Sequence, residues 1–215
     1  MNKIHKIREP SSLRVYRNQK NAIYDGPNFT PDVKNDIKDS LLEEQGHICA
    51  YCMQGIKKSN MKVEHFLCQH SHRNQQLNYK NLLGCCKGGE GSKKSQQTCD
   101  TRKGSDILLY SPAMKPHHNK LKIKYLINGT ITSDDIKFNA QLNNTLNLNN
   151  TRFKKNRVEV SDAINSFLNK EAGSRTKAEL QKVLNKLIGL NKHGKYKPFH
   201  GYASYLLEKR IKRMK

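Results

Sequence analysis

The cysteines of this chain are spaced for metal binding. Cys49 and Cys52 form a CxxC pair, and two thiolates at that spacing in a tight turn can both reach one tetrahedral zinc ion. A redox pair or two buried thiols would have the same spacing, but no βαβ pattern surrounds the pair, which disfavours a thioredoxin-like motif. The remaining ligands must come from the other four cysteines, which are Cys68, Cys85, Cys86 and Cys99. The sequence therefore predicts a structural zinc site.

A carboxylate and an imidazole stand side by side between the two groups of cysteines. Glu64 and His65 lie in a short strand-like run over 62–66. Hydrolysis of a phosphodiester needs a base of near-neutral pKa and a divalent cation that neutralises the developing charge. His65 can supply the base, and Glu64 can bind the cation. On a regular strand the two side chains point to opposite faces, so both reach one site only where the strand ends.

The order of these motifs resembles that of the HNH (ββα-metal) endonucleases. It runs from the CxxC pair through Glu64-His65 and Asn81-Leu82-Leu83 to Cys99-Asp100 and the following Lys103-Gly104. The resemblance implies an α+β fold in which two strands and a helix form the active site beside a zinc knuckle. It also implies an endonuclease that hydrolyses phosphodiester bonds, with structural zinc and catalytic Mg²⁺ or Mn²⁺.

The same resemblance assigns roles to individual residues. His65 matches the general base, and Asn81 matches the Asn that orients this base through a loop. Asp100 stands where the family has its last His or Asn, so this position departs from the pattern and leaves the ligand set open. Asp100 and Glu64 would be the hard oxygen ligands of Mg²⁺ or Mn²⁺. Arg102 and Lys103 follow on the helix and could contact a phosphate.

The resemblance also selects the second pair of zinc ligands. The family has a knuckle cysteine five positions after the Asn, which leads from Asn81 to Cys86 and pairs Cys86 with Cys99, while Cys85 remains a substitute. The twelve residues 87–98 split this knuckle, where the family has two. Such an insertion is compatible with zinc if both ends return to the metal, and it could also face the substrate.

A narrower resemblance covers more of the chain. The runs 41–52, 63–66 and 146–149 look like the HNH subunit of Septu-type anti-phage systems, which also occurs beside some retrons. This resemblance implies a role in defence, a partner ATPase of the ABC/SMC-like class and, in a retron, a reverse transcriptase with its msDNA. DNA is the favoured substrate. An RNA- or tRNA-cleaving effector and a non-catalytic zinc module that binds nucleic acid are the alternatives.

The charge of the chain favours a polyanionic partner. There are 40 Lys and Arg against 18 Asp and Glu, a net charge of +22, and such a field attracts nucleic acid. No stretch approaches the ~20 apolar residues of a membrane helix. The first residues also lack the apolar region of a secretory signal. We therefore expect a cytoplasmic protein with no membrane partner, in which cysteines serve metals or catalysis before disulfides.

The elements that must position these residues divide the chain into four parts. We expect an irregular basic arm over 1–30, the nuclease core with its zinc knuckle over 31–110, a β-hairpin and connector over 111–150, and a basic helical lobe over 151–215. In the core, Thr30, Pro31 and Gly46 mark a helix with Val33, Ile37, Leu41 and Leu42 on one face.

The second half of the chain carries equally clear local signals. Leu121, Ile123, Tyr125 and Ile127 alternate with lysines before Asn128-Gly129, which predicts a hairpin with one apolar and one basic face. Helices are expected around Val160, Ile164, Phe167 and Leu168, from a capping box at Thr176 and Glu179 to Gly189, and from about Tyr202 to the end. The lobe over 151–215 holds 17 Lys and Arg and 5 acidic residues. It could contact a phosphate backbone or an acidic partner, or be a solvated surface.

Overall fold

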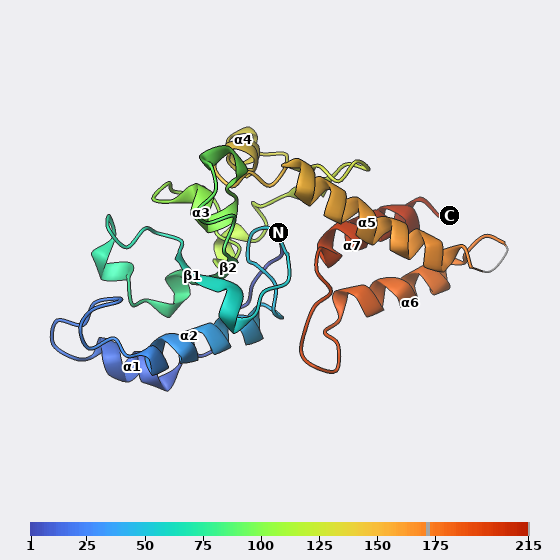
Figure 1. Cartoon of the computed structure of the whole chain (residues 1–215). Coiled ribbons are helices and arrows are strands. Elements are labelled where there is room, and N and C mark those ends of the chain that lie inside the picture. Colours follow the sequence, from blue (N-terminus) through green and yellow to red (C-terminus); the bar gives the residue numbers. More distant parts are fainter. Residues whose placement is uncertain (171–172, 215) are drawn as a thin grey trace.

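In a computed structural model, which describes residues 1–170 and 173–214, the chain is a mixed α+β protein (Figure 1). The fold class that the sequence predicts is thus confirmed. No helix of the described residues has the length and apolar character to cross a membrane. The elements follow in the order α1 (Ser11–Arg17), α2 (Pro31–Glu44), β1 (Met61–His65), β2 (Leu82–Cys86), α3 (Cys99–Lys103), β3 (Ile123–Tyr125), β4 (Ile131–Ser133), α4 (Ile136–Asn144), α5 (Thr151–Leu168), α6 (Lys177–Ile188) and α7 (His200–Arg213).

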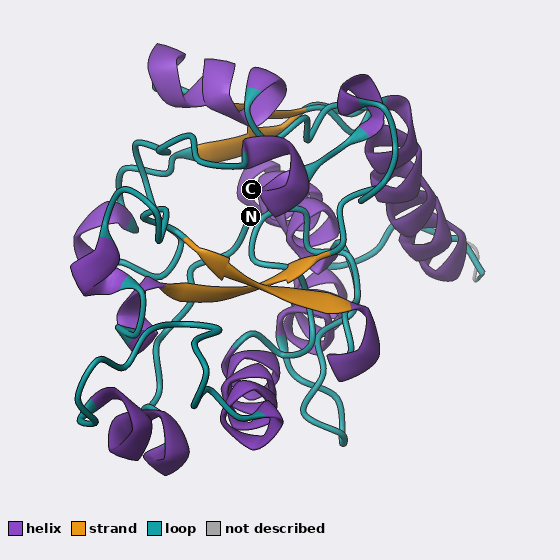
Figure 2. Ribbon diagram, turned by 60° about the vertical axis from the view of Figure 1, so that its left-hand side comes forward, coloured by secondary structure: helices purple, strands orange, loops and turns teal. Residues whose placement is uncertain are grey.

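A two-stranded antiparallel sheet lies at the centre of the first half of the chain (Figure 2). The register pairs Glu64 of β1 with Leu83 of β2, and His65 with Leu82. Helix α2 packs against this sheet, and α3 packs against β2. As predicted, Thr30 caps α2 by accepting a hydrogen bond from the backbone N–H of Val33, and the expected apolar face of the helix is buried. The sheet, α2 and α3 therefore frame the residues that the motifs single out.

The segment before α2 is more ordered than the sequence indicates. The prediction of an irregular arm is wrong for Ser11–Arg17, which form α1. Leu13 and Tyr16 of α1 are buried, and α1 packs against α2. The Lys6 ammonium binds the Glu44 carboxylate at 2.5 Å and the Leu82 carbonyl at 2.8 Å. A helix of seven residues with two buried apolar side chains gives too weak a periodic signal for prediction. Packing against distant parts of the chain stabilises it instead.

The expected hairpin is present as β3 and β4, with its turn from Leu126 to Gly129. Gly129 has a φ of +79°, and an added Cβ there would lie 2.4 Å from the Lys154 carbonyl oxygen of α5. The apolar face is shorter than predicted, because Ile127 belongs to the turn and is 86% exposed. The hairpin therefore contacts the C-terminal helices through its glycine turn.

Helices α5, α6 and α7 form the C-terminal lobe, seen on the right of Figure 1. The predicted capping box of α6 at Thr176 and Glu179 is present. The expected apolar face of α5 is only partly right, because Phe167 is 58% exposed while Ile164 and Leu168 are buried. Helix α7 begins two residues before Tyr202 and ends at Arg213, and Lys215 lies outside the described residues. The lobe has an apolar cluster of its own, made by Ile164, Leu168, Leu180, Leu184, Leu187, Ala203, Leu207 and Ile211.

Candidate metal centre and active site

The CxxC pair lies in a tight loop after α2. The backbone N–H of Cys49 donates to the Gln54 carbonyl at 2.8 Å, and that of Met53 donates to the Cys49 carbonyl at 3.0 Å. Met53 has a left-handed φ of +62°, which reverses the chain directly after Cys52. The loop is joined to the sheet because the N–H of Ala50 donates to the Gly84 carbonyl of β2. This geometry turns both thiols toward the end of β2.

The other two cysteines of the centre come from two successive elements that the insertion 87–98 separates. Cys86 ends β2 and Cys99 begins α3. The insertion 87–98 between them returns to its starting point, because the Thr98 N–H donates to the Gly88 carbonyl at 2.8 Å and the Thr101 hydroxyl donates to the Lys87 carbonyl. Both ends of the split knuckle thus lie together, as a shared metal requires.

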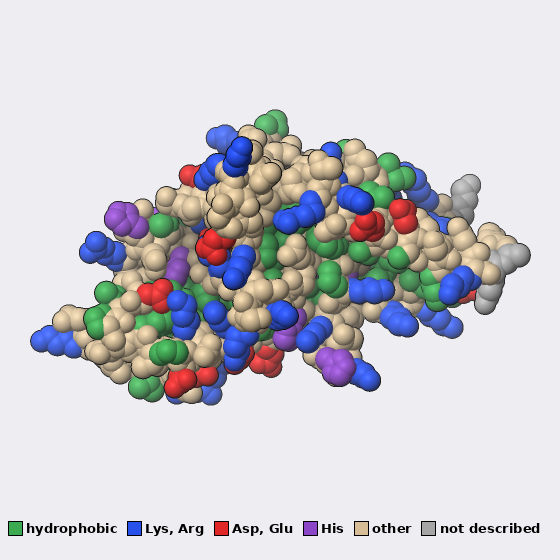
Figure 3. All heavy atoms as spheres, in the orientation of Figure 1, with side chains coloured by type: hydrophobic (Ala, Val, Ile, Leu, Met, Phe, Trp, Pro, Cys, Tyr) green, Lys and Arg blue, Asp and Glu red, His purple; other side chains and the backbone are tan. Residues whose placement is uncertain are grey.

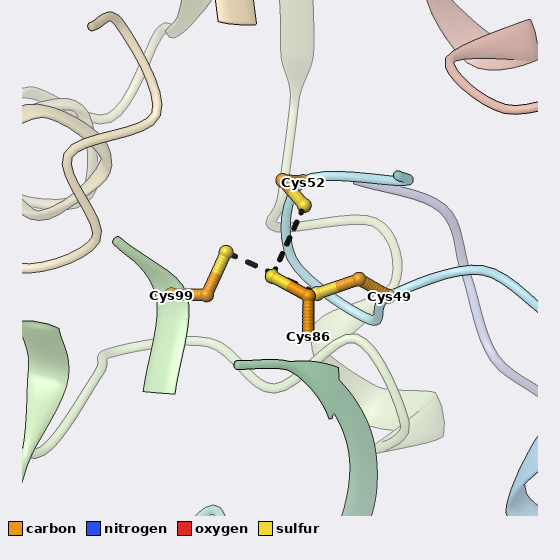
Figure 4. A group of neighbouring side chains, drawn as sticks. All are labelled: Cys49, Cys52, Cys86 and Cys99. Carbon is orange, nitrogen blue, oxygen red and sulfur yellow. Dashed lines mark hydrogen bonds between the residues drawn. The ribbon is translucent and has the colours of Figure 1, made fainter. Parts of the chain in front are cut away.

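The sulfur atoms of Cys49, Cys52, Cys86 and Cys99 all lie within 4.8 Å of one another (Figure 4). The Cys49–Cys99 and Cys52–Cys86 sulfurs are 3.9 and 3.8 Å apart. Tetrahedral zinc with bonds of about 2.3 Å sets its sulfurs roughly 3.8 Å apart, whereas a disulfide needs about 2.05 Å. The four buried cysteines could therefore hold a metal such as zinc.

Strand geometry supports the same four ligands. Burial raises the pKa of the Cys52, Cys85 and Cys99 thiols well above the usual range. At Cys49, burial is outweighed by hydrogen bonds from neighbouring thiols, which lower the pKa. The pKa shifts therefore do not separate Cys85 from the four. Cys85 neighbours Cys86 on β2, so its side chain points to the opposite face of the strand. It is not part of the four-sulfur group, although it was a possible substitute from the sequence.

His65 is the last residue of β1 and is 8% exposed. Its ring packs edge-on against Tyr24, with the ring centroids 4.5 Å apart. The Nε2 atom lies 2.9 Å from the Gln76 carbonyl oxygen. A carbonyl oxygen only accepts hydrogen bonds, so Nε2 carries the hydrogen and Nδ1 of the neutral ring carries the lone pair. Burial lowers the pKa of His65, which favours the neutral ring near pH 7.

Asn81 holds the loop that carries Gln76. Its Oδ1 atom accepts from the Leu67 N–H at 2.8 Å, and its Nδ2 atom donates to the Leu67 carbonyl at 3.0 Å and to the Gln75 carbonyl at 3.2 Å. Gln75 directly precedes the residue whose carbonyl binds His65. The structure thus connects Asn81 to the imidazole through two neighbouring peptide groups of one loop.

Glu64 and Asp100 face each other from β1 and α3. Burial raises the pKa of the Glu64 carboxyl well above its usual range, and the neighbouring Asp100 carboxylate raises it further. The Lys103 ammonium lies 2.9 Å from Glu64 Oε1, with both side chains almost fully buried. The Lys62 ammonium lies 3.3 Å from Asp100 Oδ2. The Lys103 ammonium therefore offsets only part of the rise in the pKa of Glu64.

Arg102, the other residue predicted to contact a phosphate, forms its hydrogen bonds with backbone carbonyls away from the carboxylate pair. Its Nε atom donates to the Asn144 carbonyl at 3.2 Å, and its guanidinium also contacts the Lys94 carbonyl of the insertion. Sequence reasoning missed Tyr51 and Lys62. The period of two along β1 places Lys62 on the face of Glu64 and could have indicated it. The contact of Tyr51 with Glu64 joins a loop to a separate strand and has no local signal.

These features define an α+β protein with a candidate zinc centre beside a pair of carboxylates and a buried imidazole. No protein-family model matches the chain. Over 96 residues it is 33% identical to the Septu protein PtuB of Bacillus thuringiensis. The matched segment is 43% of this chain and 35% of that protein, so the chain spans about a third of the relative's length. The similarity supports the relationship to the Septu group that the sequence motifs predict.

Proposed function

We propose that this protein is a metal-dependent endonuclease of the HNH type that hydrolyses phosphodiester bonds of nucleic acid, with DNA as the favoured substrate. The observation that carries the proposal is the environment of His65. The Gln76 carbonyl fixes the hydrogen on Nε2, and no hydrogen bond engages Nδ1 within the described part of the chain. A buried, neutral and oriented imidazole of this kind suits a general base.

The neighbouring residues supply the rest of the chemistry. His65 would take the proton from the attacking water, and Asn81 would keep the ring oriented through the 67–76 loop. Glu64 and Asp100 would hold Mg²⁺ or Mn²⁺, and such a cation neutralises charge on the phosphate and the leaving oxygen. Lys103 and Arg102 stay the candidates for contacting phosphate, although in this structure Lys103 binds Glu64 and Arg102 binds the Asn144 and Lys94 carbonyls.

The charge distribution supports a nucleic-acid substrate. On the face that Figure 3 shows, Lys and Arg side chains are scattered over both the core and the C-terminal helices, and acidic side chains lie among them in smaller number. The predicted attack by water on phosphorus needs no 2′-hydroxyl, so RNA remains the alternative substrate. Incubation of the protein with duplex DNA and with total RNA in Mn²⁺ distinguishes the two, because only the true substrate is degraded.

The similarity to a Septu protein supports a role in anti-phage defence. In that role we infer an ATPase of the ABC/SMC-like class as partner and, in a retron, a reverse transcriptase with its msDNA. A neighbouring gene for such an ATPase is the expected observation, and a locus without one would remove the main support for this partner.

A His65→Ala variant tests the nuclease itself. We expect it to keep its zinc and its fold, because the imidazole is not among the four sulfur ligands, and to lose cleavage in Mg²⁺ or Mn²⁺ by about 10²-fold or more. His193→Ala is the control, since His193 is exposed in the loop before α7. Cleavage at the normal rate by His65→Ala would refute this site and favour the alternative, a non-catalytic zinc module that binds nucleic acid.

A further inference from the structure

Tyr51 connects the zinc knuckle to the carboxylate pair. It lies between Cys49 and Cys52, and its side chain is fully buried. Its hydroxyl donates a hydrogen bond to Glu64 Oε1 at 3.0 Å. The donor comes from the loop after α2 and the acceptor from β1, so one bond joins the metal knuckle to the candidate catalytic strand.

The backbone of Tyr51 is fixed from both sides. The two neighbouring cysteines belong to the four-sulfur group, and the Ala50 N–H is bound to β2. The hydroxyl therefore has a position that depends on the knuckle. Tyr51 and Lys103 both bind Oε1 of Glu64, which leaves Oε2 without a nitrogen or hydroxyl donor in the described part of the chain. Oε2 is the oxygen that a cation could bind.

The chain contains a second group of the same composition. Tyr79 donates to the buried Glu44 at 2.9 Å, and Glu44 also binds the ammonium of Lys6. There, however, both carboxylate oxygens have donors, because Oε1 binds Lys6 while Oε2 accepts from Tyr79 and from the Ile7 N–H. The Glu44 group is thus closed, whereas the second oxygen of Glu64 has no nitrogen or hydroxyl donor in the described part of the chain and the Glu64 carboxyl lies against that of Asp100.

From this contrast we propose that Tyr51 is a positioning residue, through which the zinc knuckle fixes the Glu64 carboxylate for a divalent cation held with Asp100. The inference rests on the proposed function, because it requires a cation at this carboxylate pair. Hydrogen-bond donors to a ligating carboxylate restrict its rotation, and their loss weakens metal binding by about 10- to 100-fold. Without the Tyr51 hydroxyl, Glu64 would keep only the ammonium of Lys103 as a hydrogen-bond donor, and Lys103 also binds the His65 and Gly104 carbonyls.

The test compares Tyr51→Phe with the matched variant Tyr79→Phe, each prepared with zinc. Each substitution removes a tyrosine hydroxyl that donates a hydrogen bond to a buried carboxylate. Zinc content is measured directly, Mn²⁺ binding is measured by the electron paramagnetic resonance of free Mn²⁺, and cleavage of plasmid DNA is followed as Mn²⁺ is varied. The Glu64→Gln variant shows which part of the Mn²⁺ binding belongs to this site.

We expect Tyr51→Phe to keep its zinc, to bind Mn²⁺ about tenfold more weakly, and to need correspondingly more Mn²⁺ for half-maximal cleavage, with a near-normal rate at saturation. Tyr79→Phe should bind Mn²⁺ normally, and Tyr51→Phe should add nothing to Glu64→Gln. The proposal is overturned if Tyr51→Phe binds Mn²⁺ normally, if it loses zinc, or if Tyr79→Phe has the same effect. If the wild-type chain binds no Mn²⁺, or Glu64→Gln binds it equally well, the metal site of the proposed function fails as well.

Discussion

At the scale of single residues, Asn81 differs from a carboxylate because both its amide oxygen and its amide nitrogen form hydrogen bonds. Asn81 is 2% exposed and uses its oxygen for the Leu67 N–H and its nitrogen for the carbonyls of Leu67 and Gln75. No other neutral side chain of this size can accept one bond and donate two in that direction. The chemical identity of the residue is therefore required by the loop that holds His65.

An Asn81→Asp variant should separate the accepted hydrogen bond of Asn81 from its two donated ones. The carboxylate can still accept from Leu67, but it loses both donated bonds and faces two carbonyl oxygens, so we expect a loss of about 2–4 kcal/mol in the free energy of unfolding. Cleavage should fall more than substrate binding, because the imidazole loses its orientation. Urea unfolding and cleavage kinetics measure the two effects.

Asn78→Asp is the matched control for that variant. Its oxygen caps the short turn Tyr79–Asn81 by accepting from Lys80, and a carboxylate keeps this bond. Its one donated bond goes to the Oε1 atom of the half-buried Gln75 side chain, whose amide can rotate and donate to the carboxylate instead. The control should stay within about 1 kcal/mol of the wild type. An Asn81→Asp protein as stable and active as this control would show that the loop does not depend on the amide.

At the scale of elements, the split knuckle depends on a glycine at its base. Gly88 has a φ of +55°, and an added Cβ would lie 2.1 Å from the Thr98 carbonyl oxygen. That contact is a backbone atom beside Cys99, so it cannot move without shifting a candidate zinc ligand. Gly91 lies in the same insertion with a φ of +82° and nothing within 4 Å of its added Cβ.

Gly88→Ala should therefore weaken the metal centre, while Gly91→Ala should not. Both variants carry the cost of a left-handed alanine, about 1 kcal/mol, but only the first pushes the ends of the knuckle apart. We expect zinc transfer to a chromogenic chelator to be about tenfold faster or more in Gly88→Ala. Equal release rates in the two variants would mean that closure of the insertion does not hold the second half-site.

The sequence predicts elements whose signals are local. Thr30 and the pair Thr176 and Glu179 mark helix starts correctly because a cap needs only its own first turn. Cys49 and Cys52 could be selected from their own spacing, and Cys86 and Cys99 from the resemblance to the HNH endonucleases. Neither the burial of Arg157 nor the exposure of Phe167 could be predicted, since each depends on which element packs across from α5.

At the scale of the whole molecule, the segment Leu146-Asn147-Leu148-Asn149 joins three regions. The Leu146 carbonyl accepts from the Cys99 N–H, the Asn147 side chain donates to the Ser95 and Gln97 carbonyls of the insertion, and Asn149 makes two bonds with Ile131 of β4. The sequence singled out this run by resemblance alone. Its physical role is to connect the candidate zinc centre with the hairpin and the helix α5 that follows.

Arg157 of α5 completes this connection from the C-terminal lobe. It is 1% exposed, and its guanidinium donates at 2.7 Å to the Gly129 carbonyl of the hairpin turn and at 2.7 Å to the Leu148 carbonyl. Burial lowers the pKa of Arg157, which expresses the cost of keeping a cation inside. The two carbonyls offset that cost. This bond pair, which requires a guanidinium, is one of the attachments of the lobe to the core, beside the bond of the Tyr202 hydroxyl to the Ile127 carbonyl.

Arg157→Met tests whether this attachment makes the core and the lobe unfold cooperatively. The thioether fills much of the space but leaves two buried carbonyls without donors, so we expect a loss of about 3 kcal/mol or more. The exposed Arg152→Met on the same helix should change stability by less than about 0.5 kcal/mol. Because α5, α6 and α7 share an apolar cluster separate from the core, the amides of α6 and α7 should exchange hydrogen faster in Arg157→Met while those of β1 and β2 stay protected. Uniformly faster exchange in both regions would instead mean that core and lobe unfold as one unit without this bond pair.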